Sequence, residues 1–338
     1  MVNEIKTKEP ATAVYRLFGF DFVSEYPFSR LLFKEGESLD GLSSPVHIVF
    51  DTQPPFQVDL EFGELIYTNP FSFENSESNV CFYKFQTYHL LRFTNLVDFF
   101  LRSNRIDCRI YNNYHQPLVE DLFLGAVMSV WLELQDMPVL HASAMVINGQ
   151  LAAFPADSGN GKTTLATALL QAGHALFTDD IFPLENRLDG FWSHPGAPGL
   201  NLWPDQSIHF LGDSDFPYLP RNMLKPNKTR IPVGRDSFYN ESKVLRSIYL
   251  PNRLEPGNRN ANIKIEPVKP AEAVIELIHH SFARYVMDRL GWQARRLEFF
   301  ARLVKQVPVR RLLYPSGFEY LPRVTDAILQ DLERLKSQ

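Results

Sequence analysis

Cysteine, long apolar runs and excess positive charge are the features that this chain of 338 residues has least of. Its only two cysteines, Cys81 and Cys108, cannot form a disulfide scaffold or a four-cysteine zinc site, and they favour a reducing compartment. The net charge of −5 excludes the bulk positive field that non-specific nucleic-acid binding needs. We therefore expect no nucleic-acid partner.

Signals for export or for a membrane are equally scarce. The first ten residues carry four charged side chains and no apolar core of a signal peptide. The longest apolar run, from Leu122 to Leu132, has about half of the ~20 residues that a membrane span requires, so it indicates a buried helix or strand. The sequence thus predicts a soluble, cytoplasmic protein with no membrane partner.

Phenylalanine is abundant and unevenly distributed, since 16 of the 27 lie before residue 124. Alternating stretches at 17–22, 47–50, 58–62 and 79–85 indicate short, half-buried strands. They predict a mostly β N-terminal domain over residues 1–118, followed by a second domain over residues 119–338. The alternative is that these strands extend the sheet of the second domain.

The second half of the chain mixes helical and strand patterns, which predicts an α/β core with C-terminal helices. Asn148-Gly149, between two apolar runs, is a strong hairpin signal. Seven prolines between residues 195 and 232 argue against regular central strands or helices there and favour a long loop. The expected helices are 121–134, 162–172, 270–290, 292–306 and 321–336, and the expected strands are 139–154, 175–177, 244–250 and 309–314.

The strongest motif fits the Walker A pattern, with Ala in place of its first Gly. Its residues are Ala156, Asp157, Ser158, Gly159, Asn160, Gly161, Lys162 and Thr163, with Thr164 directly after them. Glycines let backbone N–H groups turn toward phosphate oxygens, the lysine bridges the terminal phosphates, and the Thr hydroxyl coordinates Mg²⁺. The motif lies between a predicted strand and a predicted helix, so it predicts a phosphate-binding loop rather than an ordinary glycine turn.

Two carboxylates follow the next predicted strand. At the carboxyl end of a strand in an open sheet, Asp179 or Asp180 could hold Mg²⁺ while its neighbour accepts a proton. The alternative for the pair is a helix cap or a solvated turn. His141, beside apolar strands, is on its own more typical of a satisfied core histidine than of a catalytic one.

These residues together resemble the HPr kinase/phosphorylase family, and more closely its shorter relatives, the HPr-kinase-related serine kinases. The resemblance rests on His141-Ala142-Ser143, the Asp-Ser inside the loop at 156–163, Ala172-Gly173-His174 and Thr178-Asp179-Asp180. It is strong over residues 139–185 and looser to about residue 335. Before residue 120 the chain has little in common with the family.

The resemblance implies transfer of the ATP γ-phosphoryl group to a serine hydroxyl. By the family pattern, Asp180 would act as base, Asp179 and Thr163 would serve the metal, and His141 would lie close to the acidic residues. Lys162 would complete the catalytic set. How the two aspartates divide their roles is less firmly implied than the pair itself.

The sequence departs from the family in one respect. It lacks the family's E-x-R-G-x-G signature, which is tied to the reverse phosphorolysis reaction, so we do not expect phosphorylase activity. Asp205 could replace that glutamate as an outer metal ligand, or simply cap a helix. A basic concentration in the proline-rich region offers Lys228 and Arg230 as cations for the transferred phosphate, although most of such a run is usually a solvated face. Its other members are Arg221, Lys225 and Arg235.

The leading hypothesis is an ATP- and Mg²⁺-dependent kinase acting on a serine of a small protein or peptide. A small-molecule kinase on the same scaffold is an alternative, and a nucleotide-switched peptide-binding module without catalysis is another. The sequence leaves the acceptor and a possible homo-oligomer open.

Overall fold

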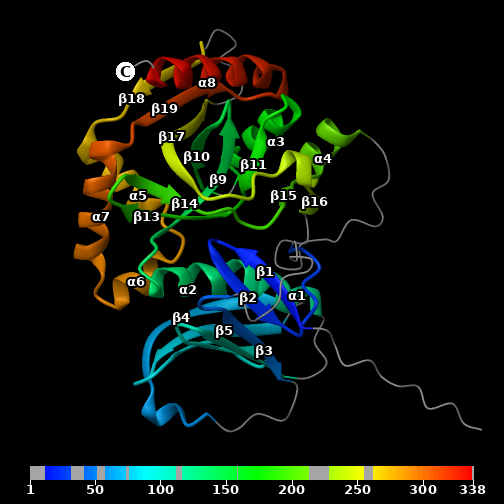
Figure 1. Cartoon of the computed structure of the whole chain (residues 1–338), viewed down its shortest axis with the longest axis vertical. Helices are drawn as coiled ribbons and strands as arrows, with labels where there is room; N and C mark the ends of the chain where they lie inside the picture. Colours follow the sequence, from blue (N-terminus) through cyan, green and yellow to red (C-terminus); the bar gives the residue numbers. More distant parts are fainter. Residues whose placement is uncertain are drawn as a thin grey trace, which may run out of the picture. The chain divides into compact units, whose positions relative to one another are not determined.

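The computed structural model of the chain describes residues 12–31, 42–51, 58–73, 76–111, 116–157, 159–212, 228–254 and 262–336. The chain divides into two compact units, Met1–Val119 and Glu120–Gln338. It is a mixed α/β protein, with a β-sheet unit first and most of its helices in the second unit (Figure 1). Within the described ranges, no helix is both long and apolar enough to cross a membrane.

The first unit contains one eight-stranded sheet with the order β1-β2-β3-β8-β7-β6-β5-β4. Its pairs are antiparallel except for β2–β3 and β3–β8, which are parallel. Fully buried aromatic rings such as Phe22, Phe82 and Phe99 form its core. The strands are β1 (Ala13–Leu17), β2 (Phe20–Ser24), β3 (Val46–Asp51), β4 (Glu64–Phe73), β5 (Ser76–Lys84), β6 (His89–Phe93), β7 (Val97–Leu101) and β8 (Arg105–Ile110).

The mostly β character predicted before residue 118 is confirmed, and these strands do not extend the second sheet. Two local predictions are wrong. The stretch 17–22 is a hairpin, because Phe18 and Gly19 take positive φ angles and turn the chain between β1 and β2. Residues 60–62 form a single 3₁₀ turn capped by the Asp59 side chain. Alternating hydrophobicity over five or six residues is compatible with a strand and with a turn. The residues that favour a turn therefore determine which of the two forms. Both cysteines are free thiols.

A nine-stranded sheet forms the centre of the second unit, with the main order β11-β9-β10-β17-β14-β13. The predicted hairpin is confirmed, since β9 and β10 pair through the Asn148-Gly149 turn, in which both residues have positive φ. The strands of the second unit are β9 (Val139–Ile147), β10 (Gln150–Pro155), β11 (Ala175–Thr178), β12 (Ile181–Pro183), β13 (Glu185–Arg187), β14 (Gly190–Ser193), β15 (Gly199–Leu202), β16 (Thr229–Pro232), β17 (Lys243–Leu254), β18 (Lys264–Pro267) and β19 (Val309–Pro315).

Helices cover both faces of this sheet. Alternate residues of β9, including Ala142 and Ala144, pack into a core with Leu277 of α5 (Pro270–His279) and Phe300 of α7 (Gln293–Gln306). The other face carries α3 (Lys162–Gln171) and α8 (Leu321–Lys336), which pack on each other. Figure 1 shows α3 beside β9 and β11. Because side chains alternate along a strand, His141 and Ser143 lie on the α3 face.

The helix predictions mostly hold. The stretch predicted over 121–134 begins earlier, as α1 (Gln116–Leu122), a π-helical turn (Phe123–Val127) and α2 (Met128–Leu134). The helix predicted over 270–290 is wrong, because the chain breaks between α5 and α6 (Arg284–Arg289). At this break the carbonyl of His280 accepts the N–H of His141, and Ser281 bridges to Leu140. Sheet contacts thus interrupt a continuous helical pattern.

The proline-rich region contains more regular structure than predicted. It holds β15, α4 (Pro204–Leu211) and β16, with β15 and β16 paired antiparallel. Pro204 occupies the first turn of α4, where a missing N–H costs no helical hydrogen bond. Arg221 and Lys225 lie outside the described residues.

Candidate functional site

The glycine-rich loop, residues 156–163, and the acidic pair, Asp179 and Asp180, lie at one edge of the second sheet. Strand β9 is antiparallel to both β10 and β11, so β10 and β11 run in the same direction. The loop follows the end of β10 and the acidic pair follows the end of β11. The topology therefore brings the two motifs together, as expected for the carboxyl ends of two strands that run in the same direction on either side of β9.

Two glycines give the loop its shape. Gly159 and Gly161 have φ angles of +91° and +87°, in the left-handed region that side chains disfavour. A Cβ on Gly161 would lie only 2.7 Å from the Tyr314 hydroxyl. The loop is also held from outside, because Arg253 of β17 donates to the Gly159 carbonyl at 3.2 Å. Ser158 lies outside the described residues.

Helix α3 begins at the end of the loop with three buried polar residues, Lys162, Thr163 and Thr164. Lys162 Nζ lies 3.7 Å from Asp180 Oδ1, and the Thr163 hydroxyl donates to Asp179 Oδ1 at 3.3 Å. Gln206 of α4 donates to the Thr164 hydroxyl at 2.8 Å, which ties α4 to α3. The first N–H groups of an α-helix have no partner within the helix, and they make its N-terminus attractive to anions.

Asp179 accepts hydrogen bonds from several directions. The Ser143 hydroxyl lies 2.5 Å from Oδ1, and the backbone N–H of Asn201 donates to Oδ2 at 3.2 Å. Burial and the neighbouring charge of Asp180 raise the pKa of Asp179, while Lys162, Ser143 and Lys228 oppose the rise. A carboxylate in this environment would gain from a further positive charge nearby.

Asp180 occupies the turn between β11 and β12 with a φ angle of +69°. Such a backbone is costly for a residue with a side chain, and Asp and Asn tolerate it best. The turn directs the carboxylate toward His141, whose Nε2 lies 3.3 Å from Oδ1, and toward the Asn201 side chain, 3.3 Å from Oδ2. Because about a fifth of its side chain is exposed, Asp180 is accessible from solvent.

The three remaining predicted residues are placed differently. Lys228 is 2% exposed, its Nζ lies 5.1 Å from the centre of the Trp203 ring, and its charge acts on Asp179. Arg230 pairs across β15–β16 with Asn201. Asp205 is exposed in the first turn of α4, and within the described ranges its side chain makes no hydrogen bond or ion pair. Its role as an outer metal ligand stays a prediction.

Two histidines that the sequence reasoning missed contact Asp157 in the loop. His279 Nε2 and His280 Nδ1 each lie 3.4 Å from a carboxylate oxygen of Asp157. Burial lowers the pKa of His280, with the charge of Asp157 opposing it. No sequence pattern connects the end of α5 with residue 157, so only the fold reveals this contact.

Ser143 and Asn201 were also missed as site residues. Ser143 is two residues after His141 in a strand, so a period of two already places both side chains on one face. That signal was available in the sequence. Asn201 gave no signal, because its contribution depends on β15 forming within the proline-rich region.

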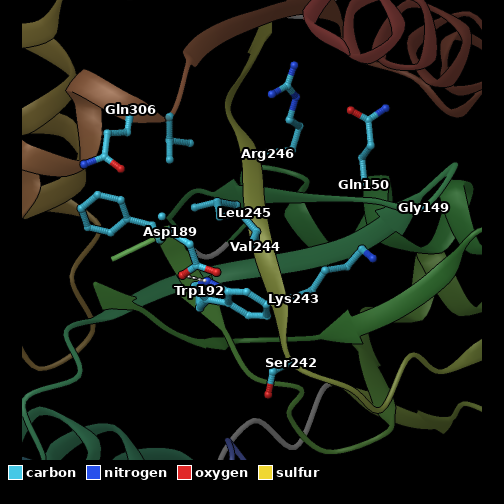
Figure 2. A pocket seen from close by; sticks show the side chains of 13 residues that line it. Gly149, Gln150, Asp189, Trp192, Ser242, Lys243, Val244, Leu245, Arg246 and Gln306 are labelled. Carbon is cyan, nitrogen blue, oxygen red and sulfur yellow. Dashed lines mark hydrogen bonds between the residues drawn. The ribbon is translucent and has the colours of Figure 1, made fainter. Parts of the chain in front are cut away.

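A separate pocket of about 460 Å³ lies at the Asn148-Gly149 end of β10, away from the loop. Figure 2 shows Trp192 against Asp189, with the indole N–H donating to the carboxylate at 2.9 Å. Arg246 donates to the Leu335 carbonyl, and Lys243 lies over the Tyr239 ring. The glycine-rich loop, a helix N-terminus and the acidic pair come together only at the loop edge, so we take that edge as the candidate site.

Comparison with known proteins adds little to this geometry. No protein-family model matches the chain, and no curated protein matches it. Among solved structures, the HPr(Ser) kinase/phosphatase from Coxiella burnetii is similar, with 14% sequence identity and a TM-score of 0.31. The similarity covers 59% of this chain and 92% of that one. A likeness this distant does not define the fold or the activity of the present chain.

Proposed function

We propose that the second unit is an α/β P-loop kinase core of the HPr kinase-like type. In this proposal it transfers the γ-phosphoryl group of ATP to a serine hydroxyl of a small protein or peptide. One observation carries the proposal: a lysine and a threonine at a helix N-terminus meet two carboxylates at the same sheet edge. Phosphoryl transfer depends mainly on positioning and on neutralising charge, and this arrangement supports both.

The glycine-rich loop would hold the terminal phosphates of ATP. Gly159 and Gly161 have positive φ angles and no Cβ, so a phosphate can approach the backbone N–H groups closely. The dipole at the N-terminus of α3 also favours an anion there. Lys162 would neutralise the β- and γ-phosphates from inside the site. Lys228, directly before β16, would add a second cation. Arg230 lies two residues further on, within β16.

The donor set beside the loop fits Mg²⁺. Hydroxyl and carboxylate oxygens are the ligands that this hard cation prefers, and Thr163 and Asp179 supply one of each. Burial raises the pKa of Asp179, and a bound cation would favour its ionised form. When bound, Mg²⁺ would neutralise charge on the transferred group. Ser143 and Asn201 would fix the orientation of the Asp179 carboxylate.

Asp180 would accept the proton of the attacking serine hydroxyl. It is accessible enough for an acceptor to approach, and two neighbours, His141 and Lys162, hold its Oδ1. After the transfer the proton would reside on Asp180, from which His141 could pass it toward solvent. The missing phosphorolysis signature supports transfer in this direction only.

The test follows labelled γ-phosphate from ATP, with Mg²⁺ present, into small proteins and peptides that co-purify with the full-length chain. The expected result is acid-stable phosphoserine with the wild-type protein and at least about a hundredfold less with Asp180→Asn. Label found only in small metabolites would instead favour a small-molecule kinase. ATP binding without any transfer, unchanged by Asp180→Asn, would favour the nucleotide-switched binding module.

A further inference from the structure

A cluster of three potential metal ligands joins the loop to the end of α5 and includes neither member of the acidic pair. Asp157 comes from the loop, and His279 and His280 come from the end of α5. One ligand atom from each residue can be chosen so that all three lie within 4.8 Å of one another. Residues more than a hundred positions apart in the sequence thus direct two imidazoles and one carboxylate at the same point.

The distances approach those of a tetrahedral site. The Nε2 of His279 is 3.4 Å from one carboxylate oxygen of Asp157, and the Nδ1 of His280 is 3.4 Å from the other. Ligands about 2.0–2.1 Å from a tetrahedral zinc ion lie roughly 3.3–3.4 Å from each other. A single Asp157 oxygen and the two ring nitrogens lie within 4.8 Å of one another, so the side chains would draw together to coordinate an ion.

The environment of His280 gives independent support. Its Nδ1 is buried and makes no hydrogen bond among the residues that the structure describes. Its other ring nitrogen, Nε2, lies 3.9 Å from a carboxylate oxygen of Glu276. A metal-bound histidine commonly directs its second nitrogen toward a carboxylate, which fixes the ring. A buried Nδ1 that faces Asp157 without a hydrogen bond is suited to bind a metal ion.

We propose that Asp157, His279 and His280 bind a divalent transition-metal ion of the zinc class, with the remaining position open to water. Two imidazoles and a carboxylate form a known donor set for zinc sites with an open position. Mg²⁺ prefers oxygen ligands, so the site is distinct from the one proposed at Thr163 and Asp179. The proposal does not require phosphoryl transfer.

One contact opposes metal binding. Arg284 Nη1 lies 3.2 Å from Nδ1 of His279, and a guanidinium can only donate. Nδ1 then accepts, so the neutral ring carries its proton on Nε2, the atom that would bind the ion. Metal binding requires this proton to leave Nε2 and Arg284 to move away. Arg284 also lies over the Tyr285 ring and is only partly buried, so an alternative position is within reach.

The experiment titrates metal-free, full-length protein with Co²⁺ followed by visible absorption, and with Zn²⁺ followed by calorimetry. The expected result is one ion per chain, with the cobalt spectrum of a tetrahedral site. His279→Ala and Asp157→Asn should each weaken Zn²⁺ binding at least about tenfold. Both side chains are about half exposed, so these variants should fold. His280→Ala should do the same, with circular dichroism to confirm its fold.

Two further variants sharpen the test. His47→Ala removes an exposed histidine of β3 and should leave binding unchanged. Arg284→Ala removes the competing donor and should tighten binding. Absence of stoichiometric binding would overturn the proposal. Binding that survives both His279→Ala and Asp157→Asn would do so as well, and because neither readout uses ATP, the kinase proposal would be unaffected.

Discussion

The ammonium group of Lys162, at the first residue of α3, lies 3.7 Å from the carboxylate of Asp180, in the turn after β11. Each side chain belongs to a different motif, and the sheet brings both to one edge. Lys162 is 3% exposed, so the carboxylate of Asp180 supplies a nearby negative charge to a buried cation. This relationship underlies the first two predictions.

Replacing Lys162 by Ala should reduce phosphate transfer at least about a hundredfold, because a buried cation that neutralises transferred charge is lost. Circular dichroism should show the fold preserved. The measurement is label transfer under the conditions described above. Lys243→Ala, in the other pocket, is the matched control and should retain full activity. Equal activities of the two variants would contradict the site assignment.

Replacing Asp180 by Asn should lower kcat by about 10²–10⁴ while nucleotide affinity stays similar, because Asn cannot accept the hydroxyl proton. Asn is also among the residues that best tolerate the positive φ angle at this position, so the turn should survive. Kinetics and equilibrium nucleotide binding measure the two effects separately. Asp189→Asn provides the control. An active Asp180→Asn protein would rule out this base.

Two glycine-to-alanine variants of the loop should differ in how much stability and nucleotide affinity they lose. Ala at 159 or 161 pays a left-handed strain of about 1–2 kcal/mol. At Gly161 the new Cβ also meets the Tyr314 hydroxyl at 2.7 Å, whereas at Gly159 no atom lies within 4 Å. Gly161→Ala should therefore lower Tm and nucleotide affinity more than Gly159→Ala. Adding Tyr314→Phe should remove the difference, and a double variant as impaired as Gly161→Ala would refute the steric argument.

The buried ion pair between Glu133 of α2 and Arg296 of α7, at 2.6 Å, predicts a stability effect. Arg296→Met should cost about 3–5 kcal/mol, because it leaves a buried carboxylate without its partner. The double variant Glu133→Gln, Arg296→Met should recover much of that loss. Urea unfolding measures both changes. A double variant as unstable as the single one would contradict the account.

The same pair has a pH signature. Burial already raises the pKa of Glu133, and Arg296 opposes the rise, so removing Arg296 should raise the pKa further. A group with a raised folded-state pKa takes up a proton on folding, so its contribution to stability falls as pH rises above the ordinary value of 4.5. The penalty of Arg296→Met should thus be larger at neutral pH than below pH 4.5. A penalty independent of pH would show that Glu133 is not responsible.

Local chemistry made some elements predictable from the sequence. Asn148-Gly149 predicts its hairpin because both residues accept positive φ, and Gly173 ends α3 for the same reason. The strand before the loop and the helix after it follow from the pattern of apolar residues. Together they were enough to expect the loop and the acidic pair near each other.

Long-range packing decided the rest. The break after α5 depends on two hydrogen bonds with β9, in which the His280 carbonyl accepts the N–H of His141 and the N–H of Phe282 donates to the Val139 carbonyl. No helical pattern encodes these contacts. The same break directs the two histidines at Asp157. Asn201 reaches the acidic pair only because β15 pairs with β16 beside α3, in a region whose prolines argued against strands.

The most direct measurement is a crystal structure of the chain with Mg²⁺ and a non-hydrolysable ATP analogue. The account predicts that the terminal phosphates lie against the backbone N–H groups between Ala156 and Thr163. Lys162 should contact the γ-phosphate, and the metal should lie between Thr163 and Asp179. A triphosphate bound elsewhere, or an empty loop at saturating nucleotide, would contradict it.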